Sequence, residues 1–553
     1  SNTYNRKRGF VHMKVLIIGG VAAGTKAAAK LKRENQGYEV QILTKSAEIS
    51  YAGCGLPYYV GSIIEDKEEL IVNTPESFAK QTGVMVSTET EVTHIDRSEK
   101  TVTALNLKTK ESTVYSYDKL IVASGASPVI PPIDGIHLKN VFYMRTPEDA
   151  ISLRETLETS GIKRAVIAGA GFIGLEVAEN LASKGVRVSV IDMADQILPG
   201  FDTEFAAYIE NHLADHGIMS FTGTRLEAIL GTDTVEKVQT SRRAMKADAV
   251  ILSIGIRANT EFLADTGIEL MPNRTVKVNE HLQTNDQDIY AIGDCACVIN
   301  AITKEPAWSP MGSSANIEGR IAAKNIGGKN ISYNGVLGTG VCKLPELNVG
   351  KTGLSEAAAI AAGFDAVSVI SVVDDKAHYY PGASAFIVKM IADKKTHKLL
   401  GLQAAGKGAV DKMVDIAAAA ISLHAALEDV ENMDLAYAPP FSTAIHPFSS
   451  TVNILLNKLS GEFETFTPVE YQEGKAEGYR LIDASITPQI DGARYIDLSS
   501  VNGPVPELNT DDKLLLVCSK GKRAYMLQNR MKYYGYTNTR VLEGGTAFNE
   551  IEG

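Results

Sequence analysis

Two glycine-rich segments, each between an apolar strand and an alanine-rich helix, constrain the fold of this chain more than any other feature. The first joins the apolar residues 15–18 to Gly19–Gly24 (GGVAAG), and the second joins residues 165–168 to Gly169–Gly174 (GAGFIG). Such a segment places backbone N–H groups at a helix N-terminus, where the partial positive charge suits a pyrophosphate. Two of them in this context predict an α/β protein with two Rossmann-like dinucleotide-binding domains.

The second segment is followed by the acidic residue expected for NAD. Asp192 ends the strand 188–192, about 20 residues beyond the glycines, where a carboxylate can accept both ribose hydroxyls. It would repel a 2′-phosphate, so the sequence favours NADH over NADPH. Lys184 and Arg187 lie close enough in sequence to weaken that preference.

The first segment departs from the pattern twice. Val21 replaces the middle glycine, and the strand 40–43 ends in Thr44 and Lys45 instead of an acid. We therefore expect the ribose contact to come from Glu48 or Lys45. Two segments imply two dinucleotides, and a flavin with a nicotinamide nucleotide is the natural pair, but the first fingerprint alone does not identify its ligand.

A lone cysteine follows the first segment by about 30 residues, a spacing that places it beside whatever cofactor the segment holds. Cys54 stands in Ser50–Tyr58 (SYAGCGLPY), and position 59, where a dithiol reductase would carry its second thiol, is Tyr59. The sulfur must therefore cycle against the sulfur of a small molecule or against oxygen, and not against a neighbouring thiol.

Composition narrows the class of protein. A chain of 553 residues is longer than a single hydrophobic core supports, so three or four domains are expected. The net charge of -11, with scattered basic residues, argues against nucleic acid as a principal partner.

The five cysteines suit a reducing cytoplasm better than a disulfide framework. No apolar run is long enough to span a membrane. Residues 1–12 are expected to be an expression scar with a disordered extension.

The chain divides into six segments by motif and composition. Short alternating strands at 366–373 and 385–391 and a helix at 410–427 indicate an α+β module, and strands at 479–482 and 514–517 with a helix from Lys522 indicate a last, small domain. The predicted segments are 13–125, 126–256, 257–328, 329–458, 459–474 and 475–553, of which 459–474 is expected to be a linker.

The ordered motifs resemble a known family, the pyridine nucleotide-disulfide oxidoreductases with a single active-site cysteine, particularly coenzyme A disulfide reductases, NAD(P)H-dependent persulfide reductases and related NADH oxidases. The motifs that carry the resemblance are Gly19–Gly24, Ser50–Tyr58, Val122–Ala126 (VASGA), Gly169–Gly174, Ile289–Asp294 (IYAIGD) and Tyr437–Phe441 (YAPPF).

The resemblance implies FAD in the first segment, NADH on the opposite flavin face, and a homodimer whose second subunit completes the active site. It makes 13–125 and 257–328 an FAD-binding domain, 126–256 an NAD(P)H-binding domain and 329–458 a dimerisation domain. It implies FAD-binding residues Gly19, Gly20, Gly24, Lys45, Ser124, Gly125, Asp294 and Ala315. It implies nicotinamide-nucleotide-binding residues Gly169, Gly171, Phe172, Ile173, Gly174, Glu176, Asp192 and Gly255. The substrate-binding candidates are Lys26, Ser50, Tyr51, Asn316 and Arg523.

Two tyrosines of this chain match tyrosines of the coenzyme A branch of the family. Tyr379 and Tyr437 have phenols that could hydrogen-bond a departing thiolate or donate a proton, although Tyr380 is an alternative to Tyr379 and both could instead pack at a subunit interface. His446 resembles the base of dithiol reductases, but because the coenzyme A branch uses the tyrosines, a structural role is favoured for it.

A second thiol begins the loop Cys518–Arg523 (CSKGKR), between the buried strand 514–517 and a helix. A thiolate held by backbone N–H groups, with cations and a helix N-terminus nearby, should be nucleophilic near neutral pH, and the same loop would hold a persulfide. The loop resembles a rhodanese active site, which makes 475–553 a rhodanese-like domain. The domain is nevertheless short, and a segment usual before its second strand reads Gly492–Ile496 (GARYI). Cys295 and Cys297 are expected to pack beneath the flavin and not to bind a metal.

The combined prediction is an FAD-dependent NAD(P)H oxidoreductase that reduces coenzyme A disulfide, coenzyme A persulfide or polysulfide through Cys54, while Cys518 carries sulfane sulfur. One alternative is an NADH oxidase or peroxidase, in which Cys54 cycles through a sulfenic acid. A second, non-enzymatic alternative is a redox sensor or sulfur-carrier scaffold.

Overall fold

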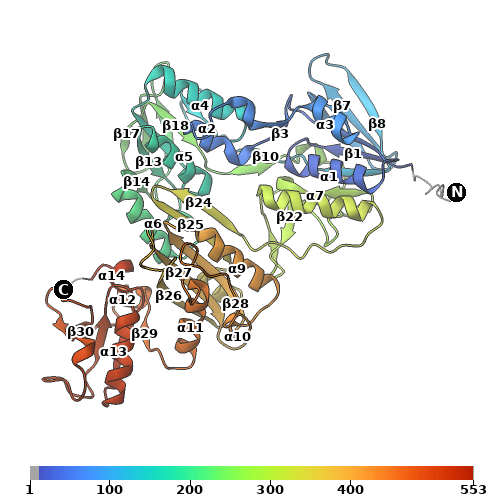
Figure 1. The fold of residues 1–553 in the computed structure, drawn as a ribbon. Coiled ribbons are helices and arrows are strands. Elements are labelled where there is room, and N and C mark those ends of the chain that lie inside the picture. Colours follow the sequence, from blue (N-terminus) through green and yellow to red (C-terminus); the bar gives the residue numbers. More distant parts are fainter. Residues whose placement is uncertain (1–11, 552–553) are drawn as a thin grey trace, which may run out of the picture. The chain divides into compact units, whose positions relative to one another are not determined.

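A computed structural model describes residues 12–551, which form two compact units (Figure 1). The first unit runs to residue 195 and includes residues 217–336, and the second comprises residues 196–216 and the chain from residue 337 onward. The expectation for residues 1–12 falls almost wholly outside the described residues.

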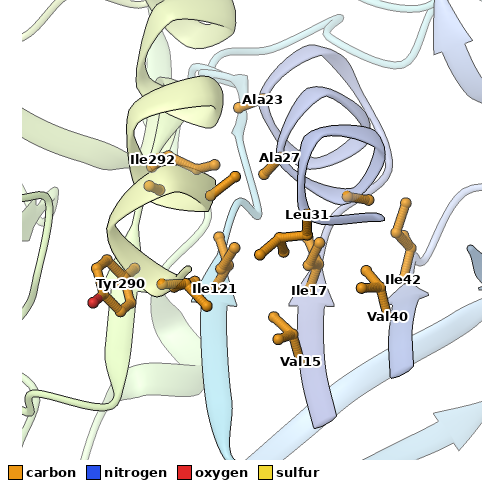
Figure 2. Packing of buried hydrophobic residues seen from close by; sticks show 14 of the residues in the cluster. Val15, Ile17, Ala23, Ala27, Leu31, Val40, Ile42, Ile121, Tyr290 and Ile292 are labelled. Carbon is orange, nitrogen blue, oxygen red and sulfur yellow. The ribbon is translucent and has the colours of Figure 1, made fainter. Parts of the chain in front are cut away.

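The first sheet of the first unit has five parallel strands in the order β21-β9-β1-β2-β5. Their apolar side chains pack against helix α1 to form a buried cluster, which Figure 2 shows. These strands are β1 (Lys14–Ile18), β2 (Glu39–Leu43), β5 (Met85–Ser87), β9 (Lys119–Val122) and β21 (Ile289–Ala291), and the helices beside them are α1 (Ala22–Glu34) and α7 (Gly312–Ile326). Because β9 and β21 come from distant parts of the chain, this domain is assembled from two sequence segments.

Smaller elements complete this first domain. The segment with Cys54 contributes β3 (Ile49–Tyr51), the 3-10 turn η1 (Gly53–Gly55), α2 (Leu56–Val60), η2 (Lys67–Leu70), β4 (Ile71–Asn73) and α3 (Pro75–Thr82). An antiparallel sheet of β6 (Thr90–Asp96), β7 (Thr101–Asn106) and β8 (Ser112–Ser116) follows. Later elements are η3 (Glu261–Leu263), β20 (Val276–Lys277), η4 (Gly293–Cys295), β22 (Ala296–Ile299) and β23 (Pro306–Ala307).

The second sheet repeats the plan, with parallel strands in the order β11-β18-β12-β13-β14. The strands are β11 (Val141–Phe142), β12 (Arg164–Ala168), β13 (Arg187–Ile191), β14 (Ile218–Phe221) and β18 (Ala249–Leu252), with helices α4 (Pro147–Ser160) and α5 (Phe172–Ser183). A meander of β15 (Leu226–Leu230), β16 (Lys237–Thr240) and β17 (Ala244–Lys246) lies beyond it, and the antiparallel pair β10 (Ala126–Pro128) and β19 (Ile256–Ala258) links the two domains. The predicted α/β class with two Rossmann-like sheets is confirmed.

The second unit begins with α6 (Thr203–Asp215), which a buried charge cluster joins to an antiparallel sheet. Lys389, 3% exposed, forms ion pairs with Asp202, Glu204 and Glu356. The sheet order is β24-β25-β28-β27-β26. Its elements are β24 (Gly340–Leu344), β25 (Leu347–Gly353), α8 (Glu356–Ala361), β26 (Ala366–Asp374), β27 (Ala385–Asp393), β28 (Leu399–Gly406), α9 (Val410–Ser422), α10 (Leu427–Val430) and α11 (Pro447–Leu459).

The helix predicted over 410–427 was too long. Helix α9 ends at Ser422, because the chain reverses through His424, whose φ of 56° lies in the left-handed region. A separate short helix, α10, then begins at Leu427.

The C-terminal domain contains a five-stranded parallel sheet in the order β29-β33-β32-β30-β31. Its elements are β29 (Thr465–Phe466), α12 (Pro468–Gln472), β30 (Arg480–Asp483), β31 (Arg494–Tyr495), η5 (Leu498–Ser500), β32 (Leu514–Val517), α13 (Lys522–Tyr533), β33 (Thr539–Leu542) and α14 (Gly545–Phe548). The prediction of a linker over 459–474 was wrong from residue 465 onward, because β29 pairs with β33 and Thr467 caps α12.

Buried Glu543 holds this domain against the preceding sheet. One carboxylate oxygen accepts the backbone N–H of Ile370 on the edge strand β26 at 2.9 Å. The other accepts the Lys458 ammonium at 2.6 Å and the Thr465 hydroxyl. A salt bridge of 2.9 Å joins Lys520, in the loop after β32, to Asp374 at the end of β26. The C-terminal domain is therefore attached by specific polar contacts as well as by its covalent connection.

Candidate active site

The first glycine segment requires glycine at two positions. Gly19 has a φ of +110°, and a Cβ added there would lie 1.9 Å from the carbonyl oxygen of Ala123. A Cβ on Gly24 would lie 2.0 Å from the carbonyl oxygen of Gly19. Helix α1 begins after Val21 with no side-chain cap, which leaves backbone N–H groups of its first turn available to an anion.

The second segment has the same backbone geometry. Gly169 has a φ of +110°, a Cβ on it would lie 2.0 Å from the carbonyl oxygen of Ser253, and one on Gly174 would lie 2.0 Å from that of Gly169. At the middle position, a Cβ on Gly171 would meet no atom within 4 Å. The middle position therefore makes no steric demand within the protein, which explains why valine is accepted at position 21 of the first segment.

A cavity of about 670 Å³ opens beside the first segment. Eight predicted site residues line it, namely Gly19, Gly20, Lys45, Tyr51, Ser124, Gly125, Asp294 and Ala315. Gly24 instead packs at the base of the loop, and Ser50, with a φ of 50°, donates its N–H to Gly20. Among the described residues, Lys26 is half-buried on α1, and the exposed Asn316 donates its amide to the Gly312 carbonyl at 2.8 Å.

Arg145 is a residue of this cavity that the sequence motifs did not reveal. Its guanidinium donates to the Asp294 carboxylate at 2.6 Å and to the Ala126 carbonyl at 3.1 Å. The Trp308 indole donates to the Asp294 carbonyl at 2.8 Å. Asn259, also missed, bonds to the backbone of Ser124 and lines the cavity. No short motif marks either residue, because each reaches the site from a distant part of the sequence.

Cys54 lies in η1, with its side chain exposed, at the entrance to α2. A Cβ added to Gly312 would lie 3.8 Å from its sulfur, so the thiol lies beside the N-terminus of α7. Although one side of the thiol faces solvent, desolvation by the surrounding wall raises its pKa, and the negative charges of Glu176 and Asp294 raise it further, while Arg145 opposes them. Burial also raises the pKa of Tyr51.

The second segment places the other nucleotide residues along α5 and the strand ends. The Asp192 carboxylate accepts the N–H of Ala170 at 2.8 Å and that of Ala194 at 2.9 Å. Burial raises the pKa of Glu176 to about 7, and a hydrogen bond from Tyr58 opposes the shift. The remaining predicted residues lie on this segment or on the neighbouring strand-end loop, where Phe172 and Ile173 open α5 and Gly255 has a φ of +126°.

The tyrosines lie in the second unit. A hydrogen bond joins the phenols of Tyr379 and Tyr437, and it is the main cause of the raised pKa of Tyr379. Both side chains are exposed, whereas Tyr380 is less so. Burial lowers the pKa of His446 to about 4, and the nearby charge of Lys412 adds to the shift. Its Nδ1 accepts the N–H of Phe448 and caps α11, which agrees with the structural role favoured from the sequence.

Cys518 occupies the loop between β32 and α13. Its sulfur accepts the backbone N–H of Gly521 at 3.0 Å and that of Ala524 at 3.4 Å, and its side chain is buried. The Arg523 guanidinium in the same loop donates to Asp497 at 2.9 Å. The loop therefore surrounds the sulfur with donors, a geometry that stabilises an anion on it.

Other candidate features have simpler roles. The buried thiol of Cys295 donates to backbone carbonyls of Val122 and Ile292, and burial raises its pKa to about 11. The Cys297 thiol is also buried and faces backbone carbonyls. Within residues 12–551, no three His, Cys, Asp or Glu side chains are grouped to hold a metal ion. No helix in the described part of the chain is both long and apolar enough to cross a membrane.

Comparisons with known proteins agree with this geometry. Residues 13–314 match the family described as pyridine nucleotide-disulphide oxidoreductase, and residues 341–447 match its dimerisation domain. The chain is 35% identical over 454 residues to an NADH oxidase of Methanocaldococcus jannaschii, which spans 81% of this chain and 100% of that protein. It is 37% identical over 450 residues to a CoA-dependent NAD(P)H sulfur oxidoreductase of Pyrococcus abyssi, spanning 80% and 98%.

A solved structure also matches the C-terminal domain. The NAD-dependent persulfide reductase from A. fulgidus superposes with a TM-score of 0.91 at 33% identity, over 97% of this chain and 100% of that one. The family matches cover most of the first unit and the antiparallel sheet of the second. This chain belongs to the pyridine nucleotide-disulphide oxidoreductases.

Proposed function

We propose that this flavin-dependent enzyme uses NAD(P)H to reduce coenzyme A disulfide, coenzyme A persulfide or polysulfide through Cys54. The observation that carries the proposal is the exposed Cys54, which has Tyr59 where a second thiol would stand and lies beside α7 close to a dinucleotide-sized cavity. The names of two relatives, a CoA-dependent sulfur oxidoreductase and a persulfide reductase, support the choice of substrate.

FAD fits the first cavity. The close approach at Gly19 and the uncapped start of α1 suit its pyrophosphate, and Asp294 with Arg145 supplies a carboxylate and a guanidinium for its polar atoms. Lys45, Ser124, Gly125 and Ala315 complete the proposed FAD contacts. When bound, FAD supplies the transfer of two electrons from NAD(P)H to sulfur.

NADH fits the second segment. Gly169, Gly171 and Gly174 bring the backbone close to a pyrophosphate, and Asp192 stands at the strand end where the ribose hydroxyls would lie. NADPH would place its 2′-phosphate against the same carboxylate, so we propose NADH as the better donor.

Cys54 begins the chemistry as a nucleophile. Its thiolate attacks a sulfur atom of R–S–S–R, a bond forms between that sulfur and Sγ, and the original S–S bond breaks to release R–S⁻. The released thiolate needs a proton or a hydrogen bond. We propose that Tyr379 and Tyr437 of a second subunit supply it, because these phenols are exposed and already bonded to each other, and because residues 341–447 match a dimerisation domain.

The C-terminal domain is proposed to be rhodanese-like and to carry sulfane sulfur on Cys518. The two N–H donors at its sulfur would stabilise a persulfide anion there. Arg523 is the proposed contact for an anionic substrate, although it must exchange its present bond to Asp497. The free cysteines of the chain support a reducing compartment, which we propose is the cytoplasm.

Coenzyme A recognition is proposed at the entrance to the Cys54 site. Lys26 on α1 is the cation proposed for its phosphates, and Ser50, Tyr51 and Asn316 are the proposed polar contacts nearby. Replacing Lys26 with alanine should raise the KM for coenzyme A disulfide about tenfold while leaving the KM for inorganic polysulfide unchanged. An equal increase in KM for both substrates would show that Lys26 does not take part in coenzyme A recognition.

Steady-state NADH consumption tests the proposal. The FAD-loaded protein is assayed separately with coenzyme A disulfide, coenzyme A persulfide, polysulfide, hydrogen peroxide and oxygen. The expected result is the highest kcat/KM with one of the sulfur substrates. Mass spectrometry of the purified protein should also find a coenzyme A adduct on Cys54. Turnover confined to oxygen or peroxide would contradict the proposal.

The second candidate is an NADH oxidase, which the name of the M. jannaschii relative favours. In this reaction Cys54 would cycle through a sulfenic acid, a state that the exposed sulfur permits. This candidate leaves the donor-lined loop of Cys518 without a role. Detection of Cys54 sulfenic acid by dimedone labelling during turnover with oxygen would favour it.

A further inference from the structure

The helix that follows Cys54 is held by the nucleotide domain through several contacts. Arg154 on α4 donates to the carbonyls of Tyr59, Ile64 and Glu65 at distances of 3.3, 3.1 and 2.8 Å, and its guanidinium lies 4.4 Å from the centre of the Tyr59 ring. At the end of α2, a Cβ on Gly61 would lie 2.0 Å from the side-chain oxygen of Asn180 on α5. Helix α2 therefore has a fixed position against α4 and α5.

This packing brings Tyr58 of α2 to Glu176 of α5. Tyr58 follows Cys54 by four residues, about one helical turn, and its hydroxyl donates to the Glu176 carboxylate. Glu176 is half-buried and stands in the first turns of the helix that the second glycine segment begins. The cysteine, the tyrosine and the carboxyl form one cluster that spans the two dinucleotide-binding domains.

The charges that face this cluster come from several elements. The charges of Glu176 on α5 and Asp294 on η4 raise the pKa of Cys54, whereas Arg145 before α4 lowers it and so favours the thiolate. For Glu176, the hydrogen bond from Tyr58 lowers the pKa and the charge of Glu179 on the same helix raises it. A negative charge on Glu176 repels a negative charge on Cys54, so an ionised Glu176 makes the Cys54 thiolate less favourable. A protonated, neutral Glu176 carboxyl does not repel the thiolate.

We propose that Glu176, positioned by its hydrogen bond with Tyr58, sets the ionisation of Cys54. The two acids act as a coupled pair, in which the loss of a proton by one makes the loss of a proton by the other less favourable. Whether Glu176, in the NAD(P)H-binding domain, is ionised therefore controls what fraction of Cys54 is present as the nucleophilic thiolate. The proposal deepens the proposed function, on which its catalytic relevance rests, and makes Glu176 a positioning residue as well as a nucleotide contact.

The test is a titration of Cys54 that needs neither substrate nor turnover. The FAD-loaded enzyme is reduced with dithiothreitol, desalted, and alkylated with iodoacetamide from pH 5 to pH 10, and the rate at Cys54 is followed by peptide mass spectrometry. In the Glu176→Gln variant the midpoint of the rate profile should fall by about one pH unit, which is about tenfold more thiolate below both midpoints. Glu176→Asp, which restores the charge, should bring the midpoint back toward the wild-type value.

A matched control removes the same charge elsewhere. Glu155 is exposed on α4 of the same domain, and Glu155→Gln should leave the Cys54 midpoint unchanged. A midpoint for Glu176→Gln equal to that of Glu155→Gln would overturn the proposal. Should Glu176→Gln not fold, Glu176→Ala provides the second variant, because it removes the same carboxylate and should also lower the Cys54 midpoint. An unchanged midpoint there would overturn the proposal equally.

The same data separate the two proposals. A shifted midpoint together with no turnover on any sulfur substrate would sustain the role of Glu176 and contradict the proposed function. An unshifted midpoint with normal coenzyme A disulfide reduction would contradict only the role of Glu176.

Discussion

Cys54 is exposed whereas Cys518 is buried, and the surroundings of the two thiols also differ in electrostatic character. Near Cys54, burial raises the pKa of Glu176 to about 7, and in the same unit burial raises that of Glu318, bonded to Gly293, to about 8. In the domain of Cys518, hydrogen bonds lower the pKa of Asp483 against the effect of burial, and bonds from Ser499 lower that of Asp497.

The difference indicates how each site is completed. The loop of Cys518 satisfies its own sulfur with two backbone N–H groups, so it can stabilise an anion without any ligand. The region of Cys54 instead lies beside a cavity of about 670 Å³ lined by the carboxylates of Glu91, Glu261 and Asp294, and we expect the bound cofactor to complete the electrostatics of this region. We therefore propose that Cys54 depends on the bound cofactor for its function, whereas the Cys518 sulfur is held by its own backbone donors.

The largest expected effect separates the two thiols by activity. Cys54→Ser should lower NADH-dependent reduction of coenzyme A disulfide by at least about 1,000-fold, because the nucleophile is lost. Cys518→Ser should leave that rate within about twofold but abolish persulfide formation in the C-terminal domain, detected as a mass increase of the corresponding peptide after polysulfide treatment. Loss of disulfide reduction in Cys518→Ser would mean that the two thiols act in one obligatory sequence.

The next effect concerns the attachment of the Cys518 domain. Glu543→Ala removes a buried carboxylate that accepts from Ile370, Lys458 and Thr465, and leaves the Lys458 ammonium without this partner. The unfolding free energy of the C-terminal domain should fall by about 3 kcal/mol. Differential scanning calorimetry should show an earlier transition for this domain. Far-UV circular dichroism and the FAD content should stay at wild-type values, and a loss of FAD would show that the contact supports the first unit as well.

The two regions also differ in how far the sequence predicted them. The glycine segments were predictable because a methyl group added at Gly19, Gly24, Gly169 or Gly174 would lie only 1.9 to 2.0 Å from a backbone oxygen, which excludes any side chain there. Those constraints act on the local backbone, so the residue pattern records them.

Features that depend on distant contacts were not predictable in the same way. Arg145 reaches Asp294 across 149 positions, and no local pattern marks such a pair. Strand β29 has two residues, too few for an alternating pattern, and exists because Thr465 and Phe466 pair with β33. The raised pKa of Glu318 arises from its burial, against the lowering effect of the hydrogen bond from the Gly293 N–H, and this burial becomes visible only when the two halves of the domain are assembled.

A third prediction uses the opposite pH dependence of the two regions. The Glu318 carboxyl is 1% exposed and keeps its proton in the folded state to a pKa of about 8, against 4.5 in the unfolded chain. The unfolded chain therefore binds fewer protons between these values, so the stability of the first unit should fall as pH rises from about 4.5 to 8. Glu318→Gln should remove this loss and stabilise the unit by about 2 kcal/mol at pH 9 relative to pH 5, measured by thermal unfolding at both pH values.

Asp483 provides the contrast. Its pKa is lowered in the folded state, so its stabilising effect is present above the unfolded value of 3.8 and is lost as pH falls through the folded value. Asp483→Asn should therefore destabilise the C-terminal domain at pH 7, and this effect should diminish as pH falls below 3.8. A Glu318→Gln variant with the same gain at pH 5 and pH 9 would show that its effect comes from packing and not from ionisation.

The smallest expected effect compares one glycine from each thiol loop. Gly521 has a φ of +101° and donates its N–H to the Cys518 sulfur, so Gly521→Ala should strain the backbone and destabilise the C-terminal domain by about 1 kcal/mol. Gly53, beside Cys54, is not in the positive-φ region, and an added Cβ would meet only the Tyr51 ring at 3.9 Å, an ordinary contact. Gly53→Ala should therefore change the melting temperature little. Because the strain in Gly521→Ala moves a donor away from sulfur, persulfide loading of Cys518 should slow several-fold, whereas alkylation of Cys54 in Gly53→Ala should keep its wild-type rate. Equal tolerance of alanine at both positions would mean that the backbone conformation of Gly521 does not hold the Cys518 loop. The contrast between a thiol stabilised by its own backbone and one that depends on a bound cofactor would then fail.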